Sequence, residues 1–350
     1  MAAVAVPLSR SELFSLQSPS GALTDEALRR LRQHSFNRGL ATDARREAWP
    51  LLLGVYPPTS TRAEHDDLAA AQLQEYKGLV ERGAALALDP AFKDGSVVAH
   101  DVNRTQVSHP LYAEHKQNLS DILLAYAAYE PEVGYGQGMS DMLAVLLFTL
   151  GEPSLAFWCF AALLGDACPA GLGSGTTSAA GAGGAGGPPS GLRGGDARRL
   201  HLASAITDTA DGVLGRLMLI LQRRAPALHV HFMATGCEGL LFCYAWVKML
   251  LKRELPFEEV GRLWEGCWGA HAVLPNAATA DDILLYCCAV ILVRRQKQLL
   301  KVKDGMAGVM NCLKEGGGAG VEPLEHSAHE LLHAAAEMAR AEKFEPGGGE

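Results

Sequence analysis

The chain has 350 residues, of which 48% are hydrophobic and 20% charged, the balance of an ordinary globular protein with a sizeable core. Its formal net charge of -8 argues against a broad surface for nucleic acid or for an anionic membrane, because both partners require clustered Lys and Arg. Local basic patches are still compatible with this composition.

The cysteines and the apolar segments indicate the compartment. The eight Cys include no CxxC pair and lie mostly in apolar helical patterns, which predicts reduced, buried side chains in a cytosolic protein. The N-terminal stretch MAAVAVPLSRSELF lacks the basic region and long apolar run of a signal peptide. The most apolar run, 240–251, contains Lys248 and is shorter than the roughly 20 residues that span a bilayer. We therefore expect a cytoplasmic protein with no integral membrane segment.

Helical patterns dominate the first half of the chain. Thr24 is a predicted N-cap for a helix that starts at Asp25, and DARREAWPLLLG predicts a second helix closed by Gly54. Apolar residues in 117–129 follow the i, i+3, i+4, i+7 spacing of an amphipathic helix. The run 138–150 is apolar nearly all round, which is typical of a helix at the centre of a domain.

The second half continues the helical pattern. PFEEVGRLWEGCW predicts an amphipathic helix with Trp264 on its apolar stripe and Glu265 on its polar face, and Glu258 and Arg262 have the i, i+4 spacing of a supporting ion pair. The run 281–300 predicts one more helix, ending in the basic sequence RRQKQLLKVK. Strand alternation is scarce, so the predicted fold class is all-α, built of many packed helices.

Two segments interrupt the helices. Residues 171–196 consist largely of Gly, Ala, Ser and Pro, which predicts a disordered, Gly-rich insertion within one domain. The sequence EGGGAG at 315–320 predicts a flexible break before a last helix from about Pro323 to Arg340.

A glycine cluster occurs in YEPEVGYGQGMSDM, residues 129–142. Gly134 and Gly136 fit the start of a dinucleotide-binding G-x-G-x-x-G motif, but Met139 takes the third glycine position and the preceding segment is helical. GMSDM lacks the last glycine of a G-x-S-x-G hydrolase elbow, and the chain has no G-x-x-x-x-G-K-[ST] phosphate loop. Two interpretations remain: a packing turn into a crowded helix, or a loop that presents Gln137.

The upstream stretch VAHDVNRT places Asp101 three residues before Arg104. If this segment is helical, the carboxylate can hold the guanidinium in place. Alone, this spacing is typical of a routine surface ion pair. The Gln-bearing loop that follows 33 residues after Arg104 gives it a second interpretation.

The two segments together resemble the TBC domain, the helical module of GTPase-activating proteins for Rab GTPases. The family signature I-x-x-D-x-x-R is matched, with Val in place of Ile, by Val98, Asp101 and Arg104. The signature Y-x-Q within G-Y-x-Q-G is matched by Tyr135 and Gln137 between Gly134 and Gly138. The resemblance, strongest to the branch of the yeast Gyp-type GAPs, covers about residues 7–300. Residues 301–350 are then expected to form a C-terminal tail with the flexible break and one helix.

The resemblance implies a mechanism for these residues. Arg104 would be an arginine finger supplied in trans to a GTP-bound Rab, and Gln137 a glutamine finger that orients the attacking water. Asp101 would position Arg104, while Tyr135, Gly134 and Gly138 would shape the glutamine loop. GTP and Mg²⁺ belong to the partner GTPase, so the resemblance implies no cofactor or metal in this chain. It also implies peripheral association with endomembranes through the Rab.

The chain departs from the family pattern at two positions. Ala245 precedes Trp246 where relatives usually carry Arg, and Gly136 stands where many relatives have a bulkier residue. The alternative function is a non-catalytic Rab-binding or adaptor module, the role of relatives that lose the Arg or the Gln. This chain keeps both.

Overall fold

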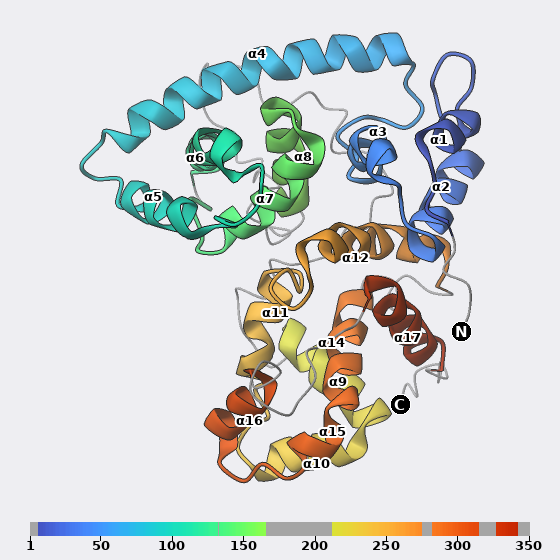
Figure 1. Ribbon diagram of the computed structural model, residues 1–350, viewed down its shortest axis with the longest axis vertical. Coiled ribbons are helices and arrows are strands. Elements are labelled where there is room, and N and C mark those ends of the chain that lie inside the picture. Colours follow the sequence, from blue (N-terminus) through green and yellow to red (C-terminus); the bar gives the residue numbers. More distant parts are fainter. Residues whose placement is uncertain (1–5, 132, 166–211, 275–281, 315–326, 342–350) are drawn as a thin grey trace, which may run out of the picture. The chain divides into compact units, whose positions relative to one another are not determined.

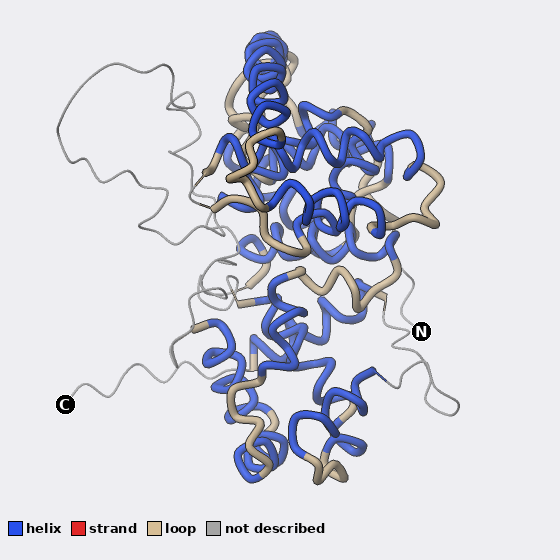
Figure 2. The backbone as a smooth tube through the Cα atoms, turned by 90° about the vertical axis from the view of Figure 1, so that its left-hand side faces the viewer, coloured by secondary structure: helices blue, strands red, loops and turns tan. Residues whose placement is uncertain are grey.

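The computed structural model describes residues 6–131, 133–165, 212–274, 282–314 and 327–341. Over these ranges the chain forms helices joined by loops, and its one β contact is an isolated parallel bridge between Leu8 and Leu40 (Figure 1 and Figure 2). The all-α prediction is confirmed. The predicted insertion at 171–196 and the predicted break at 315–320 lie outside the described residues. The chain divides into two compact units, residues 1–34 with 40–203 and residues 35–39 with 204–350.

The first unit is built from α1 to α8, with α2 counted to its residue His34. Their bounds are α1 (Arg10–Leu16), α2 (Asp25–Asn37), α3 (Thr42–Leu52), α4 (Arg62–Ala87), α5 (Asp94–Arg104), α6 (Tyr112–Tyr129), α7 (Met139–Leu150) and α8 (Pro153–Gly165). Reciprocal side-chain to backbone caps start two of them, because Ser9 pairs with Glu12 at α1 and Thr61 with Glu64 at α4. The Thr24 side chain accepts from Ala27 at the start of α2, which confirms the predicted cap.

Helix α7 lies at the centre of the first unit. All but one of its residues are buried, and it packs against α3, α5, α6 and α8. Gly138 precedes it at φ +100° and Gly151 follows it at φ +71°, left-handed conformations that suit glycine. The prediction of a buried central helix at 138–150 is therefore confirmed, and the loop that carries Gln137 leads directly into this helix.

The second unit contains the C-terminal helices. Their bounds are α9 (Val213–Arg224), α10 (Pro226–Ala234), η2 (Leu241–Cys243), α11 (Tyr244–Lys248), α12 (Phe257–Gly269), η3 (Ala270–Ala272), α14 (Ile283–Arg294), α15 (Gln296–Leu299), α16 (Gly305–Lys314) and α17 (Ala328–Arg340). The apolar helix α14 forms the core of this unit, and α9, α11 and α17 pack on it. Ser327 caps α17 by accepting from the Glu330 amide.

Three predictions for the second unit are wrong in detail. The single helix predicted over 281–300 is broken at Arg295, whose backbone (φ -98°, ψ 8°) separates α14 from α15. Glu265, predicted on a polar face, is fully buried. The predicted Glu258–Arg262 pair is not formed. Arg262 instead donates to the carbonyls of Ser35 at 3.0 Å and Phe36 at 2.6 Å.

The prediction of buried cysteines agrees with the structure, and Cys168 lies outside the described residues. None of the seven described cysteines forms a disulfide, and six are buried while Cys312 is half-buried. The apolar spacing also predicts four core tryptophans, of which Trp158, Trp246 and Trp264 belong to the core while Trp268 is half-buried. None of the helices in the described part of the chain is both long and apolar enough to cross a bilayer.

Candidate functional site

Helix α5 ends at Arg104, the first of the two candidate finger residues. Thr105 after it is extended (φ -81°, ψ 116°), and Gln106 has φ +49°, so the backbone cannot continue as a helix. The Arg104 side chain is 50% exposed at this end. A cation in the last turn also interacts favourably with the carbonyl end of the helix dipole. The local backbone therefore places a charged, accessible guanidinium at a helix terminus.

Asp101 holds this guanidinium from one turn below. Nε and Nη2 of Arg104 both donate to Asp101 Oδ1, at 3.0 and 2.6 Å, and the Asp101 side chain is only 3% exposed. Nη1 of Arg104 makes no hydrogen bond with any described residue. The buried carboxylate thus fixes the plane of the guanidinium and leaves one nitrogen available to a further acceptor.

The other oxygen of Asp101 binds Tyr135. The Tyr135 hydroxyl donates to Asp101 Oδ2 at 2.7 Å, across 34 residues of sequence. Burial is the main reason that the pKa of this phenol is raised, and the bond to Asp101 raises it further while a bond to Ser140 opposes the change. The phenol therefore stays protonated and acts as a donor. One buried carboxylate joins the arginine helix to the glutamine loop.

A second buried link runs between Thr105 and Ser140, residues that the sequence did not single out. Thr105 Oγ1 donates to the Asp101 carbonyl at 2.8 Å and shares a hydrogen bond of 2.8 Å with Ser140 Oγ. Both side chains are 2% exposed. They stand directly after Arg104 and three residues after Gln137, so they join the same two segments. The only sequence signal for Thr105 and Ser140 is their position beside the two family signatures.

The glutamine loop is also tied to the start of α5. Gly134 has φ +59°, and the next amide, that of Tyr135, donates to Asp94 Oδ2 at 3.4 Å. A Cβ at Gly134 would lie 3.3 Å from the same oxygen. Asp94 and Asp101, near the two ends of α5, therefore both contact this loop.

Gly136 and Met139 close the turn that contains Gln137. The Met139 amide donates to the Gly136 carbonyl at 3.0 Å, and the Gly136 amide lies 3.1 Å from Met139 Sδ. A Cβ at Gly136 would come no closer than 3.4 Å to Met139 Cε, an ordinary contact. The small residue at 136 is thus not required by crowding.

Gln137 itself is exposed and makes no hydrogen bond or ion pair with the described residues. Its amide can therefore both donate and accept toward a partner. The structure brings Asp101, Arg104 and Tyr135 into one bonded group, and Gln137 follows two residues after Tyr135 on the loop. The departure at Ala245 is exposed on α11, in the other unit.

Within the described ranges no group of three or more His, Cys, Asp or Glu side chains is placed to hold a metal ion. The chemistry that the candidate site offers is that of one fixed cation and one free amide. Such groups suit the binding of phosphate oxygens and the orientation of a water molecule.

The described helices place the D-x-x-R arginine at the end of α5 and the Y-x-Q glutamine on a loop that is bonded to α5. This is the architecture of a TBC-type helical module. A model of the Rab-GTPase-TBC domain matches residues 42–174 and 207–300. The chain belongs to this family.

The relatives are considerably longer than the part they share with this chain. TBC1 domain family member 17 of Homo sapiens is 28% identical over 305 residues, which are 84% of this chain and 41% of that protein. The GTPase-activating protein GYP7 of Yarrowia lipolytica is 26% identical over 318 residues, 81% of this chain and 37% of that protein. The chain spans about two fifths of the length of these relatives.

Solved structures agree on the fold. The crystal structure of the Ypt/Rab-GAP domain of Gyp1p aligns with a TM-score of 0.64 at 17% identity, covering 94% of this chain and 97% of that one. The TBC domain of the Chlamydomonas flagellar RabGAP aligns with a TM-score of 0.59, also at 17% identity, covering 89% of this chain and 84% of that one. At this identity the likeness concerns the fold.

Proposed function

We propose that the chain is a GTPase-activating protein for a GTP-bound Rab-family GTPase, with Arg104 as the arginine finger and Gln137 as the glutamine finger. The observation that carries the proposal is the buried Asp101 carboxylate, which binds Arg104 with one oxygen and Tyr135 of the glutamine loop with the other. Membership of the Rab-GTPase-TBC domain family supports the assignment of a Rab as partner.

Arg104 would act on the charge that develops during phosphoryl transfer. Negative charge grows on the phosphate oxygens, and a preorganised guanidinium stabilises it without reorganisation at the moment of reaction. An arginine finger accelerates GTP hydrolysis by roughly 10³ to 10⁵, or about 4 to 7 kcal/mol of barrier. Asp101 would serve by holding Nε and Nη2, so that Nη1 leads toward the nucleotide.

Gln137 would place the attacking water. Its carbonyl oxygen can accept a hydrogen bond from the water while its NH₂ group donates to a phosphate oxygen. Gly134 and Gly138 support this role because both have positive φ on either side of Tyr135 and Gln137. GTP and Mg²⁺ would be supplied by the partner, so the proposal needs no cofactor in this chain.

The proposed TBC domain covers residues 7–300, and residues 301–350 are proposed to be a C-terminal tail, whose helix α17 packs on α14. We further propose that the protein acts in the cytoplasm and reaches endomembranes through its Rab partner.

Single-turnover GTP hydrolysis with a panel of GTP-loaded Rabs tests the proposal. Arg104→Ala and Gln137→Ala should each remove most of the stimulation seen with the unaltered chain. Arg104→Lys should retain little of this stimulation, because Lys has no planar fork of donors. If both Ala variants stimulate as well as the unaltered chain, the finger assignment is wrong. If the chain binds a GTP-loaded Rab stably and accelerates none, the non-catalytic binding module is the better description.

A further inference from the structure

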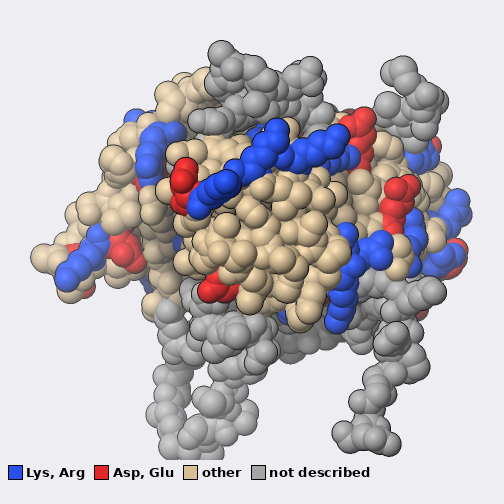
Figure 3. All heavy atoms as spheres, turned by 90° about the horizontal axis from the view of Figure 1, so that it is seen from below, with Lys and Arg blue, Asp and Glu red and all other residues tan. Residues whose placement is uncertain are grey.

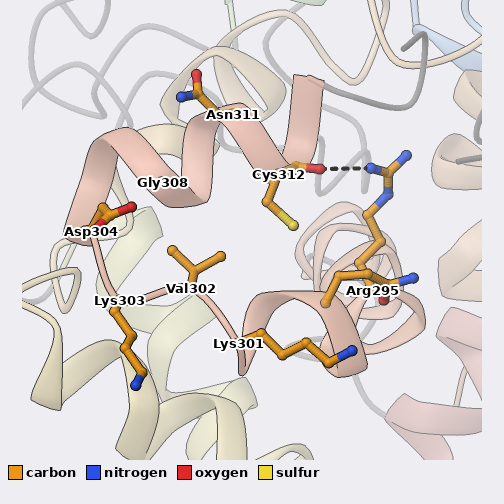
Figure 4. A pocket seen from close by; sticks show the side chains of 9 residues that line it. Arg295, Lys301, Val302, Lys303, Asp304, Gly308, Asn311 and Cys312 are labelled. Carbon is orange, nitrogen blue, oxygen red and sulfur yellow. Dashed lines mark hydrogen bonds between the residues drawn. The ribbon is translucent and has the colours of Figure 1, made fainter. Parts of the chain in front are cut away.

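A pocket of about 570 Å³ lies in the second unit between α15, the turn 300–304 and α16 (Figure 4). Its polar lining consists of Arg295, Gln298, Lys301, Lys303, Asp304 and Asn311. This volume falls in the range of about 300 to 1,000 Å³ that is typical of small-molecule sites. None of these residues belongs to the proposed finger site, so the pocket has no assigned role.

Arg295 builds one wall of the pocket. It is only 7% exposed, and its Nη1 donates to the Cys312 carbonyl at 3.0 Å and to the Leu313 carbonyl at 3.5 Å (Figure 4). Carbonyls in the last turn of a helix lack intrahelical donors, so this guanidinium caps α16 and fixes it to the start of α15. The pocket wall is therefore part of the packed structure.

The opposite wall is also closely packed. A Cβ at Gly308 would lie 2.6 Å from Val302 Cγ1 and 3.2 Å from Asp304 Cβ. Helix α16 therefore approaches the turn 302–304 at a distance that only glycine allows. Both walls are set by specific contacts, which favours a pocket that exists before any ligand binds.

The lining is positively charged in an otherwise acidic chain. It contains three cations and one carboxylate, a net charge of +2, whereas the whole chain carries -8. The stretch 294–303 contains five Lys or Arg and no Asp or Glu. Figure 3 is viewed from the side on which α10, α15 and α16 lie in Figure 1, and Lys and Arg there are more prominent than Asp and Glu.

The two lysines supply the charge that a ligand can use. Arg295 is held inside the protein by its bonds to the Cys312 and Leu313 carbonyls. Lys301 and Lys303 are exposed and form no ion pair or hydrogen bond with the described residues, and the same holds for the amides of Gln298 and Asn311.

We propose that this pocket binds a small phosphorylated ligand, with Lys301 and Lys303 on its phosphate groups and the amides of Gln298 and Asn311 on its hydroxyl groups. Flexible ammonium groups bind phosphate as point charges, and a concave wall strengthens their field. The same phosphate chemistry occurs in a free metabolite and in a lipid headgroup. If the ligand is a lipid headgroup, Leu300 and Met310 would contact the membrane. These two side chains lie next to lining residues and are 39% and 38% exposed.

The test uses the full chain and inositol 1,4,5-trisphosphate, a soluble probe with several phosphomonoesters, in calorimetric titrations at near-physiological salt. Lys301→Glu with Lys303→Glu should weaken binding by at least about 10-fold, since two charged contacts are lost and repulsion replaces them. Lys77→Glu with Lys116→Glu makes the same change of net charge on exposed helical positions of the other unit and should leave binding within about twofold.

Cys312 provides a second readout, because it lines the pocket and six other described cysteines are buried. Cys168 is first replaced by Ser, so that its thiol does not react with the alkylating reagent. Inositol 1,4,5-trisphosphate should then slow the alkylation of Cys312 when Lys301 and Lys303 are unaltered. It should not slow this reaction in Lys301→Glu with Lys303→Glu. Circular dichroism checks that the variants fold. Absence of measurable binding, or equal loss in both lysine pairs, overturns the proposal.

Two further arms distinguish the sources of phosphate. Vesicles of phosphatidylcholine with a small fraction of phosphatidylinositol 4,5-bisphosphate are compared with vesicles of equal charge made with phosphatidylserine. If only the phosphoinositide vesicles bind, with competition by the free probe and loss in Leu300→Ser with Met310→Ser, the ligand is a lipid headgroup. Binding of the soluble probe without binding of vesicles assigns the pocket to a free phosphorylated compound.

Discussion

The phenol of Tyr135 donates a hydrogen bond of 2.7 Å to Oδ2 of Asp101, the residue whose other oxygen binds Arg104. A substitution on the glutamine loop is therefore transmitted to the arginine through one carboxylate. Because Asp101 is 2% exposed and Tyr135 9% exposed, solvent offers little replacement for a lost bond. Loop and helix end should respond to mutation as one unit.

Tyr135→Phe tests this coupling. A buried hydrogen bond to a charged group contributes about 1.5 to 3 kcal/mol, so the free energy of unfolding should fall by about that amount. Stimulation of Rab GTP hydrolysis should fall at least about 10-fold through misplacement of Arg104. Tyr112→Phe is the matched control, since it removes a hydrogen bond of 3.1 Å from a tyrosine to the Val102 carbonyl in the same helix. Equal losses of activity in both variants would contradict the coupling.

Gly138 and Gly136 should respond differently to alanine. Gly138 has φ +100°, so Gly138→Ala should cost about 1 to 2 kcal/mol of stability and lower GTPase stimulation by moving Gln137. Gly136 does not have a positive φ and has room for a Cβ, so Gly136→Ala should be neutral or stabilise by up to about 1 kcal/mol. Chemical denaturation of the two variants measures both effects. A larger destabilisation at 136 than at 138 would show that the loop has a different conformation.

Thr105→Val should weaken the second buried link between α5 and the residues that follow the glutamine loop. The change removes the buried hydrogen bonds of Thr105 to the Asp101 carbonyl and to the Ser140 hydroxyl, at a cost of about 1 to 3 kcal/mol. Thr105→Ser keeps the hydroxyl and should retain both stability and GTPase stimulation. If Thr105→Val lowers stability and leaves stimulation unchanged, Thr105 supports the fold without positioning Arg104.

The sequence predicts the parts of this site that depend on local spacing. Asp101 and Arg104 are three residues apart, and the apolar run after Gly138 forms the buried helix that its composition indicates. The bonds from Tyr135 to Asp101 and from Thr105 to Ser140 span 34 and 35 residues. No periodicity encodes such contacts, because they depend on how α5 and α7 pack.

Other parts of the fold follow from signals weaker than apolar periodicity. Helix α4 is rich in Ala and in charged residues on several faces, so its pattern indicates no buried stripe, although the Thr61-x-x-Glu64 capping box marks its start. The break at Arg295 has a tertiary cause, since its side chain caps α16. Glu265 is buried although it falls on the charged stripe of α12, and the pattern of this helix alone cannot reveal such burial.

The histidines of α17 predict an acid-sensitive second unit. His329 and His333 have ring centroids 4.3 Å apart, and burial is the main reason that the pKa of each is lowered. The neighbouring charge of Arg262 lowers both further. Unfolded histidine protonates near pH 6.5, so below that pH the unfolded chain binds protons that the folded chain does not. Stability should therefore be full above about pH 6.5 and fall as the pH drops toward the lowered folded pKa values.

Thermal unfolding between about pH 7.5 and 5.5 should show a smaller decline in stability in His329→Gln with His333→Gln than in the unaltered chain. His100→Gln, at an exposed position on α5, should leave the decline unchanged. An identical decline in the double variant would assign the acid sensitivity to other groups.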